Sequence, residues 1–141
     1  KVYEFAKMIG ESEELEPEKL YILRTAAIVH DIGIKISEKK YGSSGGKYQE
    51  KEGPAVAEPM LCTLGYDEAV IDRVLFLIAH HHTYTGIEGE DYQILVEADF
   101  LVNLFEDGSG RETAEKVREN IFKTKTGMKY LETLFLTERR S

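Results

Sequence analysis

Apolar residues recur through most of the chain at intervals of three and four positions, which is the period of a helix with one buried face. Glycine and proline punctuate this pattern where such helices begin and end. The predicted helices cover residues 2–10, 17–32, 54–64, 67–82 and 90–107, and one or two more lie between 111 and 135 with a break near Thr126. No stretch of the 141 residues follows the period of a β-strand convincingly, so the sequence predicts an all-α helical bundle.

Residues 35–53 interrupt the pattern. Lysine, glycine, serine and tyrosine dominate this segment, and Pro54 is predicted to open the next helix. We expect a mobile or ligand-gated loop here, which is either a substrate lid or a plain surface loop. Neither flank is long enough to stand alone. The organisation expected is therefore a single domain over residues 1–141, with a core at 1–107 and C-terminal helices at 108–141.

Charge and cysteine content narrow the range of partners. The formal net charge of −8 argues against a broad nucleic-acid surface and against anionic membranes, but not against a small anionic substrate beside a metal ion. The single cysteine, Cys62, lies in an apolar helical pattern, and we expect a buried thiol in a reducing compartment, the cytoplasm. No membrane-spanning run or signal-peptide pattern occurs. Because the chain opens on Lys1 in mid-pattern and without Met, we expect it to be truncated at its N-terminus.

Metal-capable side chains interrupt three of the predicted apolar faces. His30 continues the apolar stripe of its helix, with Asp31 beside it. His80 and His81 end a second helix, and Asp99 lies within the stripe of a third. Taken alone, His30 would be a core imidazole bonded to a backbone carbonyl and Asp31 a residue of the helix end. Three such cases on neighbouring helices predict one shared cation, because a buried carboxylate seldom lacks a partner.

The expected ligands are nitrogen and oxygen atoms without sulfur. This set is typical of catalytic Zn, Mn, Fe, Co or Ni and fits neither Ca nor a closed structural zinc site. Successive helical residues diverge by about 100°, so three consecutive histidines cannot all face one point. We expect His80 and His81 to point inward, His81 along its helix stripe, and His82 to be more exposed. The alternative is that all three belong to a solvated helix end.

Three segments together carry a family resemblance. They are Ala26-Ala27-Ile28-Val29-His30-Asp31-Ile32-Gly33, Ile78-Ala79-His80-His81 and Glu97-Ala98-Asp99-Phe100-Leu101-Val102-Asn103. In this order and spacing they resemble the HD-domain superfamily of metal-dependent phosphohydrolases, over roughly residues 1–107. The resemblance implies a bundle of the HD-domain type, one or two divalent transition-metal ions, and hydrolysis of a phosphate ester in a nucleotide or another small phosphate.

The sequence departs from this family in two places. The family's first metal-binding histidine would precede Lys1, outside the chain. Where many two-metal members carry a histidine ahead of a Gly-Pro helix start, this chain has residues 49–52, Gln-Glu-Lys-Glu. Glu50 or Glu52 is then either an oxygen ligand or a solvated charge. The Gly-Tyr-Pro extension of the cyclic-dinucleotide phosphodiesterase branch is missing, so that activity is not supported.

The resemblance assigns roles residue by residue. The implied metal ligands are His30, Asp31, Asp99, His80 and His81, of which the last two bind either a second ion or the substrate phosphate. The expected substrate contacts are His82, Asn103 and Glu50. Asp31 or Asp99 would also orient the attacking water. Lys35, which follows His30 and Asp31 closely in the chain, would neutralise phosphate charge.

Two other functions remain open on the sequence alone. One is a degenerate domain that binds a metal or nucleotide as a sensor without turnover, which the absent first histidine and the Gln49-Glu50 pair would support. The other is oxidative chemistry at a di-iron site, which some members of this fold carry out. The partner expected is a small phosphorylated compound, and a homodimer is also compatible with the sequence.

Overall fold

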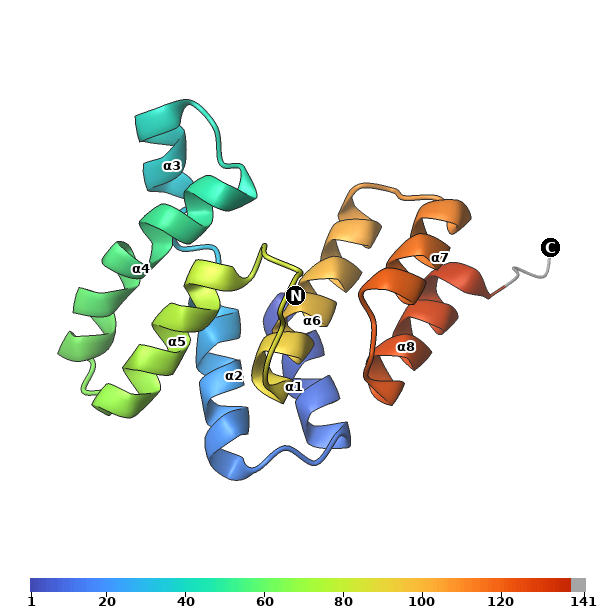
Figure 1. Cartoon of the computed structure of the whole chain (residues 1–141), viewed down its shortest axis with the longest axis horizontal. Helices are drawn as coiled ribbons and strands as arrows, with labels where there is room; N and C mark the ends of the chain where they lie inside the picture. Colours follow the sequence, from blue (N-terminus) through green and yellow to red (C-terminus); the bar gives the residue numbers. More distant parts are fainter. Residues whose placement is uncertain (138–141) are drawn as a thin grey trace.

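The computed structural model describes residues 1–137 and confirms the all-α fold (Figure 1). This described part of the chain contains eight α-helices and one short π-helix, and no strand. They are α1 (Val2–Ser12), α2 (Pro17–Val29), α3 (Ile34–Tyr41), α4 (Gly46–Thr63), α5 (Glu68–His80), α6 (Glu90–Glu106), α7 (Arg111–Asn120), α8 (Lys125–Leu131) and η1 (Glu132–Leu136). Between residues 1 and 137, no helix is long and apolar enough to cross a lipid bilayer.

Helix α6 is the centre of the hydrophobic core. It is buried without interruption from Asp91 to Asp99, because α1, α2 and α8 pack around it. A helix that is surrounded needs apolar residues on every face, and each fully buried side chain such as Leu95 contributes about 1.5–3 kcal/mol of hydrophobic stabilisation. The carboxylates of Glu97 and Asp99 are buried with these apolar side chains. Both therefore need polar partners from elsewhere in the chain.

The ends of α2 and α5 meet beside α6. His30 follows the last residue of α2, and His81 follows the last residue of α5. The centroids of these two imidazole rings lie 5.5 Å apart. Asp99, on α6, forms an ion pair with His30. Side chains from three helices are thus gathered at one place in the bundle.

Residues 34–53 form a helical hairpin rather than the expected loop. α3 projects from the bundle and lies against the first turns of α4 (Figure 1). The helices approach closely because the contact is made by small residues: a Cβ atom added at Gly33 would lie 2.8 Å from the backbone nitrogen of Gly53. Ser37 is also fully buried. Small and polar residues make this contact, so no apolar period marks it in the sequence.

Helix α4 begins earlier than expected and buries only some of its apolar residues. Pro54 lies inside this helix rather than at its start. Ala57 and Leu61 are buried, whereas Leu64 is 66% exposed. Cys62 is exposed, so the expectation of a buried thiol is wrong. Packing against α3 and α5 fixes the rotation of α4, and its apolar residues outnumber the positions that face the bundle.

The break in the C-terminal region lies at residues 121–124, before the expected position at Thr126. Glu97 of α6 is fully buried and accepts hydrogen bonds from the backbone N–H groups of Lys123 and Thr124, at 2.9 and 3.0 Å. A carboxylate far away in the chain therefore fixes this turn. A contact between such distant residues cannot be predicted from the local sequence pattern.

Candidate active site

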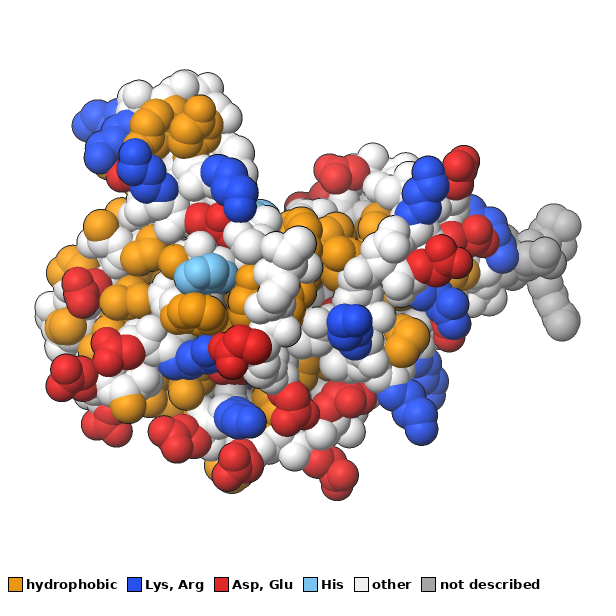
Figure 2. Space-filling view, viewed as in Figure 1, with side chains coloured by type: hydrophobic (Ala, Val, Ile, Leu, Met, Phe, Trp, Pro, Cys, Tyr) orange, Lys and Arg blue, Asp and Glu red, His pale blue; other side chains and the backbone are white. Residues whose placement is uncertain are grey.

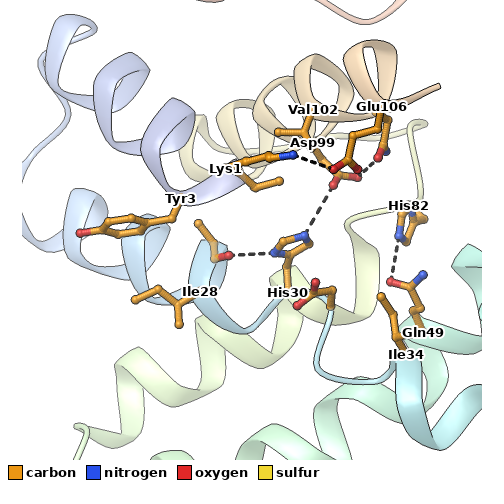
Figure 3. Close-up of a pocket in the computed structure, with 14 residues that line it drawn as sticks. Lys1, Tyr3, Ile28, His30, Ile34, Gln49, His82, Asp99, Val102 and Glu106 are labelled. Atoms are coloured by element: carbon orange, nitrogen blue, oxygen red, sulfur yellow. Dashed lines mark hydrogen bonds and ion pairs between the residues drawn. The ribbon is translucent and has the colours of Figure 1, made fainter. Parts of the chain in front are cut away.

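A pocket of about 630 Å³ opens between the start of α1, the end of α2, the second half of α6 and the hairpin of α3 and α4 (Figure 3). Its wall combines ionisable and amide side chains with several apolar ones. The lining residues are Lys1, Val2, Tyr3, Ala27, Ile28, His30, Asp31, Ile34, Gln49, His82, Asp99, Val102, Asn103 and Glu106. The predicted site residues that it brings together are His30, Asp31, His82, Asp99 and Asn103.

His30 is held in one tautomer by the backbone. Its Nδ1 lies 2.8 Å from the carbonyl oxygen of Ala27 (Figure 3). A carbonyl only accepts hydrogen bonds, so Nδ1 carries the proton and donates it. In the neutral ring the lone pair is then on Nε2, which is the usual arrangement of a metal-binding histidine whose other nitrogen is anchored on a carbonyl.

The Nε2 atom of His30 lies 3.5 Å from Oδ1 of Asp99. This separation exceeds the usual N–H···O distance of about 2.7–3.2 Å. It is close to the distance of about 3.4 Å between two ligand atoms that each lie about 2.1 Å from one tetrahedral ion. Both side chains are buried, and the two groups favour each other's charged forms. The pair therefore attracts positive charge, either a proton or a cation, to this point.

The pKa values of this pair follow the same logic. Burial alone would lower the pKa of His30, but the neighbouring carboxylate of Asp99 outweighs burial and raises it. Burial alone would raise the pKa of Asp99, but His30 and the nearby imidazoles lower it. Without a cation, His30 is thus the group that holds a proton here.

His81 is a buried imidazole with an unpaired nitrogen. It is fully buried, and its Nδ1 donates to the carbonyl oxygen of Ile78 at 2.7 Å. Its Nε2 atom has no hydrogen-bond partner among the described residues. Burial, together with the neighbouring imidazole of His82, lowers the pKa of His81 to about 4, so the ring is neutral near pH 7 with a lone pair on Nε2. An orphaned buried polar atom costs about 1–3 kcal/mol, which a ligand at this atom would relieve.

Asp31 and Asn103 lie at the pocket wall. Asp31 is exposed there, and within residues 1–137 its carboxylate makes no hydrogen bond or ion pair. Asn103 is one helical turn after Asp99, and its Nδ2 donates to Oδ2 of that carboxylate at 3.4 Å. The amide thus steadies the Asp99 side chain.

The histidine triplet is arranged differently from the expectation that His80 faces inward and His82 outward. Nδ1 of His80 donates to the carbonyl oxygen of Phe76 at 2.7 Å, its ring stacks on Phe76, and it does not line the pocket. His82 does line it, with Nε2 at 3.3 Å from Oε1 of Gln49 (Figure 3). Helix α5 ends at His80, so the helical rotation of about 100° per residue does not extend to the residues that follow.

Glu50 positions the backbone next to the pocket rather than lining it. It is buried, and its Oε2 accepts hydrogen bonds from the backbone N–H of His82 at 3.0 Å and from Oγ1 of Thr83 at 2.8 Å. Glu52 is also buried and accepts from Lys40 and from the hydroxyl of Tyr41. The expectation of a solvated charge is therefore wrong for both carboxylates.

Several pocket residues were not singled out from the sequence. Gln49 was noted only as a departure from the family, and nothing in the sequence marked Tyr3 or Ile28 as pocket residues. Lys1 and Glu106, which form an ion pair at 3.2 Å, close one side (Figure 3). Conversely, the predicted Lys35 is exposed on α3 and is not part of the pocket wall.

The donor set fits a divalent cation in part. The fixed tautomers of His30 and His81, the orphaned nitrogen of His81 and the spacing between His30 and Asp99 all suit one. No three His, Cys, Asp or Glu side chains within residues 1–137 are grouped as closely as a metal ion requires. The described residues therefore provide a ligand pair with a third nitrogen nearby.

Comparison with known proteins identifies the family. The family model described as HD domain matches residues 1–123, which is most of the chain. The match includes the pocket and all its lining residues. No curated protein and no solved structure matches the chain.

Proposed function

This chain belongs to the HD-domain family, and we propose that it is a metal-dependent phosphohydrolase that cleaves a phosphate ester in a small phosphorylated compound such as a nucleotide. The observation that carries the proposal is the buried pair of His30 and Asp99, 3.5 Å apart, at the wall of a pocket of about 630 Å³. That volume lies in the range of pockets that enclose small ligands.

His30, Asp99 and His81 are the residues that would hold the cation, with Asp31 nearby at the pocket wall. Their nitrogen and oxygen donors suit Mn, Fe, Co, Ni or Zn, as one ion or two. When bound, such an ion would lower the pKa of water toward ~7 and polarise a phosphoryl oxygen.

Other pocket residues would accept a proton or bind the substrate. Asp31 has no partner among the described residues, so its carboxylate can accept a proton from the attacking water. His82 and Asn103 carry N–H groups that suit phosphate oxygens. The exposed side chain of Ile28, with Val102, offers an apolar wall for the organic part of the substrate.

A metal or nucleotide sensor without turnover is the second candidate. It is favoured by the incomplete grouping of ligands within residues 1–137 and by residues 49–52, Gln-Glu-Lys-Glu, in the region where many two-metal relatives would carry a histidine. Such a domain would bind the cation and a phosphate through the same residues without hydrolysing the ester.

The test is hydrolysis of a panel of nucleotides and simple phosphate esters with Mn, Co, Ni or Zn added. We expect metal-dependent phosphate release, and a loss of at least about 100-fold in kcat/KM for Asp99→Ala, which is about 2.7 kcal/mol of transition-state stabilisation. A matched control is Glu106→Ala, which removes a carboxylate at the pocket edge that pairs with Lys1 rather than with an imidazole.

The outcomes separate the two candidates. Cation binding measured by calorimetry, without hydrolysis of any substrate, would favour the sensor. Full metal-dependent activity of Asp99→Ala would contradict the assignment of Asp99 to the centre. Iron content and oxygen uptake would reveal oxidative chemistry instead.

A further inference from the structure

The hairpin of α3 and the first turns of α4, residues 34–52, forms a separate surface feature beside the pocket. It projects from the bundle (Figure 1), and its visible face carries lysine side chains around exposed hydrophobic groups (Figure 2). Nothing in the proposed chemistry uses this surface. It therefore calls for an explanation of its own.

The hairpin is locally basic in a chain whose net charge is −8. Residues 34–52 contain five lysines and three glutamates, and two of these glutamates are buried. Lys35, Lys39 and Lys51 form no ion pair with any of the described residues, whereas Lys40 and Lys47 pair with the buried glutamates. The outward face of the hairpin is therefore cationic and available to an anion.

Two exposed tyrosines lie next to these lysines. The rings of Tyr41 and Tyr48 stack with centroids 4.3 Å apart and planes 16° from parallel. They are 37% and 39% exposed. The Nζ atom of Lys51 lies over the ring of Tyr41, 5.8 Å from its centroid. Exposed aromatic rings among cationic side chains are the usual means of binding the bases and phosphates of a single strand.

The hairpin is directly connected to the pocket. Ile34 at its start and Gln49 near its end both line the pocket. Nζ of Lys47 donates to Oγ1 of Thr83, next to the pocket residue His82. Tyr48 immediately precedes Gln49, so a ligand bound against the tyrosine pair needs only a short path to reach the wall of the pocket.

We propose that the α3–α4 hairpin is a binding surface for a short single-stranded oligonucleotide, which stacks a base on the exposed tyrosine pair and sets its phosphates against Lys39 and Lys51. This inference rests on the proposed function, since it makes an oligonucleotide end the substrate that enters the pocket. The patch is local, so it agrees with the overall negative charge, which argues only against a broad nucleic-acid surface.

The test measures binding in EDTA, so that it does not depend on hydrolysis. Fluorescence anisotropy with a labelled oligo(dT) of about eight nucleotides, near the span of one single-strand site, gives the dissociation constant. Tyr48→Ala is expected to weaken binding about 10-fold by removing a stacking ring, and Tyr48→Phe to preserve it. With two phosphate contacts, at Lys39 and Lys51, the affinity should fall about 7-fold as salt rises from about 50 to 200 mM.

A lysine pair provides the matched control. Lys39→Ala/Lys51→Ala should weaken binding at least about 10-fold, whereas Lys125→Ala/Lys129→Ala removes the same charge from exposed positions on α8 and should change it less than about 2-fold. Melting temperatures of all variants check that they are folded. Equal effects of the two lysine pairs, no binding at low salt, or binding that ignores Tyr48→Ala and is matched by inorganic polyphosphate would each overturn the proposal.

Hydrolysis assays keep the two proposals apart. Oligonucleotide binding to the hairpin of a protein that cleaves neither oligonucleotides nor any small phosphate ester, with any metal, would support the surface and contradict the phosphohydrolase. Small phosphate esters that are cleaved by a protein that does not bind oligonucleotides would leave the phosphohydrolase standing and overturn the hairpin surface.

Discussion

Nε2 of His30, at the end of α2, lies 3.5 Å from Oδ1 of Asp99, in the middle of α6. The two residues are far apart in the chain, and each interrupts an apolar face of its own helix. Burial would discharge either group alone, yet together they hold the pKa of His30 above its ordinary value and that of Asp99 below it. The core is thus built around a point that attracts positive charge.

Because Nε2 of His81 is unpaired among the described residues, we predict that a divalent cation bound beside His30 and Asp99 stabilises the fold. A divalent cation at about 100 times its dissociation constant should stabilise the folded chain by ~2.7 kcal/mol, or roughly 5–10 °C in melting temperature for a chain of this size. His81→Leu should abolish most of this shift. In EDTA the same variant should be at least as stable as the wild type, because it removes an orphaned buried nitrogen.

His80→Leu is the matched control for this measurement. It removes an imidazole whose ring stacks on Phe76, whereas the ring of His81 lies 5.5 Å from that of His30. It should keep the full metal-induced shift in melting temperature. Loss of the shift in both variants, or in neither, would contradict the role given to His81.

Glu52 predicts how stability changes in acid. The hydroxyl of Tyr41, followed by the ammonium of Lys40, holds the pKa of Glu52 below its ordinary value of 4.5. A lowered pKa in the folded state adds stability above the unfolded pKa, and this stability is lost as pH falls through the folded value. Urea unfolding below pH 4.5 should therefore show a smaller loss of free energy for Glu52→Gln than for the wild type.

Two variants sharpen this pH test. Tyr41→Phe removes the largest cause of the shift, so its acid dependence should approach that of Glu52→Gln. Glu58→Gln, at an exposed position of the same helix, should keep the wild-type dependence. Identical acid dependence in all four proteins would show that the Glu52 cluster does not contribute.

Local patterns predicted most helices and singled out His30, Asp31 and Asp99 among the residues that line the pocket. The apolar stripes of α2 and α6 were readable because each helix packs one or more apolar faces, and the polar exceptions His30 and Asp99 stood out against them. Their proximity could be inferred because one shared partner explains both exceptions at once. Such a period can be recognised only where a helix is long and regular.

The hairpin of α3 and α4, and the orientations of the three histidines at 80–82, could not be predicted in the same way. The contact between Gly33 and Gly53 is made by backbone and leaves no apolar period. The choice between His80 and His82 depended on where α5 ends, and that end is fixed by contacts from another segment, such as the Glu50 carboxylate on the backbone of His82. Polar contacts between distant segments fix the end of the helix and the orientation of these side chains. Such contacts cannot be recognised from a local sequence pattern.

Glu97 makes a prediction about the stability of the C-terminal helices. Its carboxylate accepts two backbone N–H groups, from Lys123 and Thr124, and the hydroxyl of Thr124. Glu97→Ala should cost about 3 kcal/mol or more in free energy of unfolding, since it leaves several donors without a partner. Gly127→Ala should also destabilise, because a Cβ atom there would collide with Oε1 of Glu97.

The control for the glycine change is Gly110→Ala. A Cβ at Gly110 meets no atom within 4 Å, so only its effect as the residue that precedes α7 remains, at most about 1 kcal/mol. Urea denaturation measures all three variants. A Gly127→Ala protein as stable as Gly110→Ala would mean that the turn at residues 121–124 can move away from Glu97.

The last prediction concerns how the hairpin positions His82. Glu50 and Glu52 are both buried carboxylates of α4, but only Glu50 accepts the backbone N–H of His82 and the hydroxyl of Thr83. Glu50→Gln keeps one acceptor oxygen but removes the charge, which weakens both of these hydrogen bonds, and its NH₂ group would face the ammonium of Lys47. The His82 amide should therefore exchange with solvent faster in Glu50→Gln, as hydrogen exchange followed by NMR would show. Catalytic efficiency toward a small phosphate ester should fall about 10-fold, since a small displacement of a positioned group is costly.

Glu52→Gln makes the same chemical change two residues along the helix, away from the pocket, and should leave both the exchange of His82 and the activity near wild type. If the two variants protect the His82 amide equally, Glu50 does not hold this segment, and the hairpin then acts on the pocket only through Ile34 and Gln49.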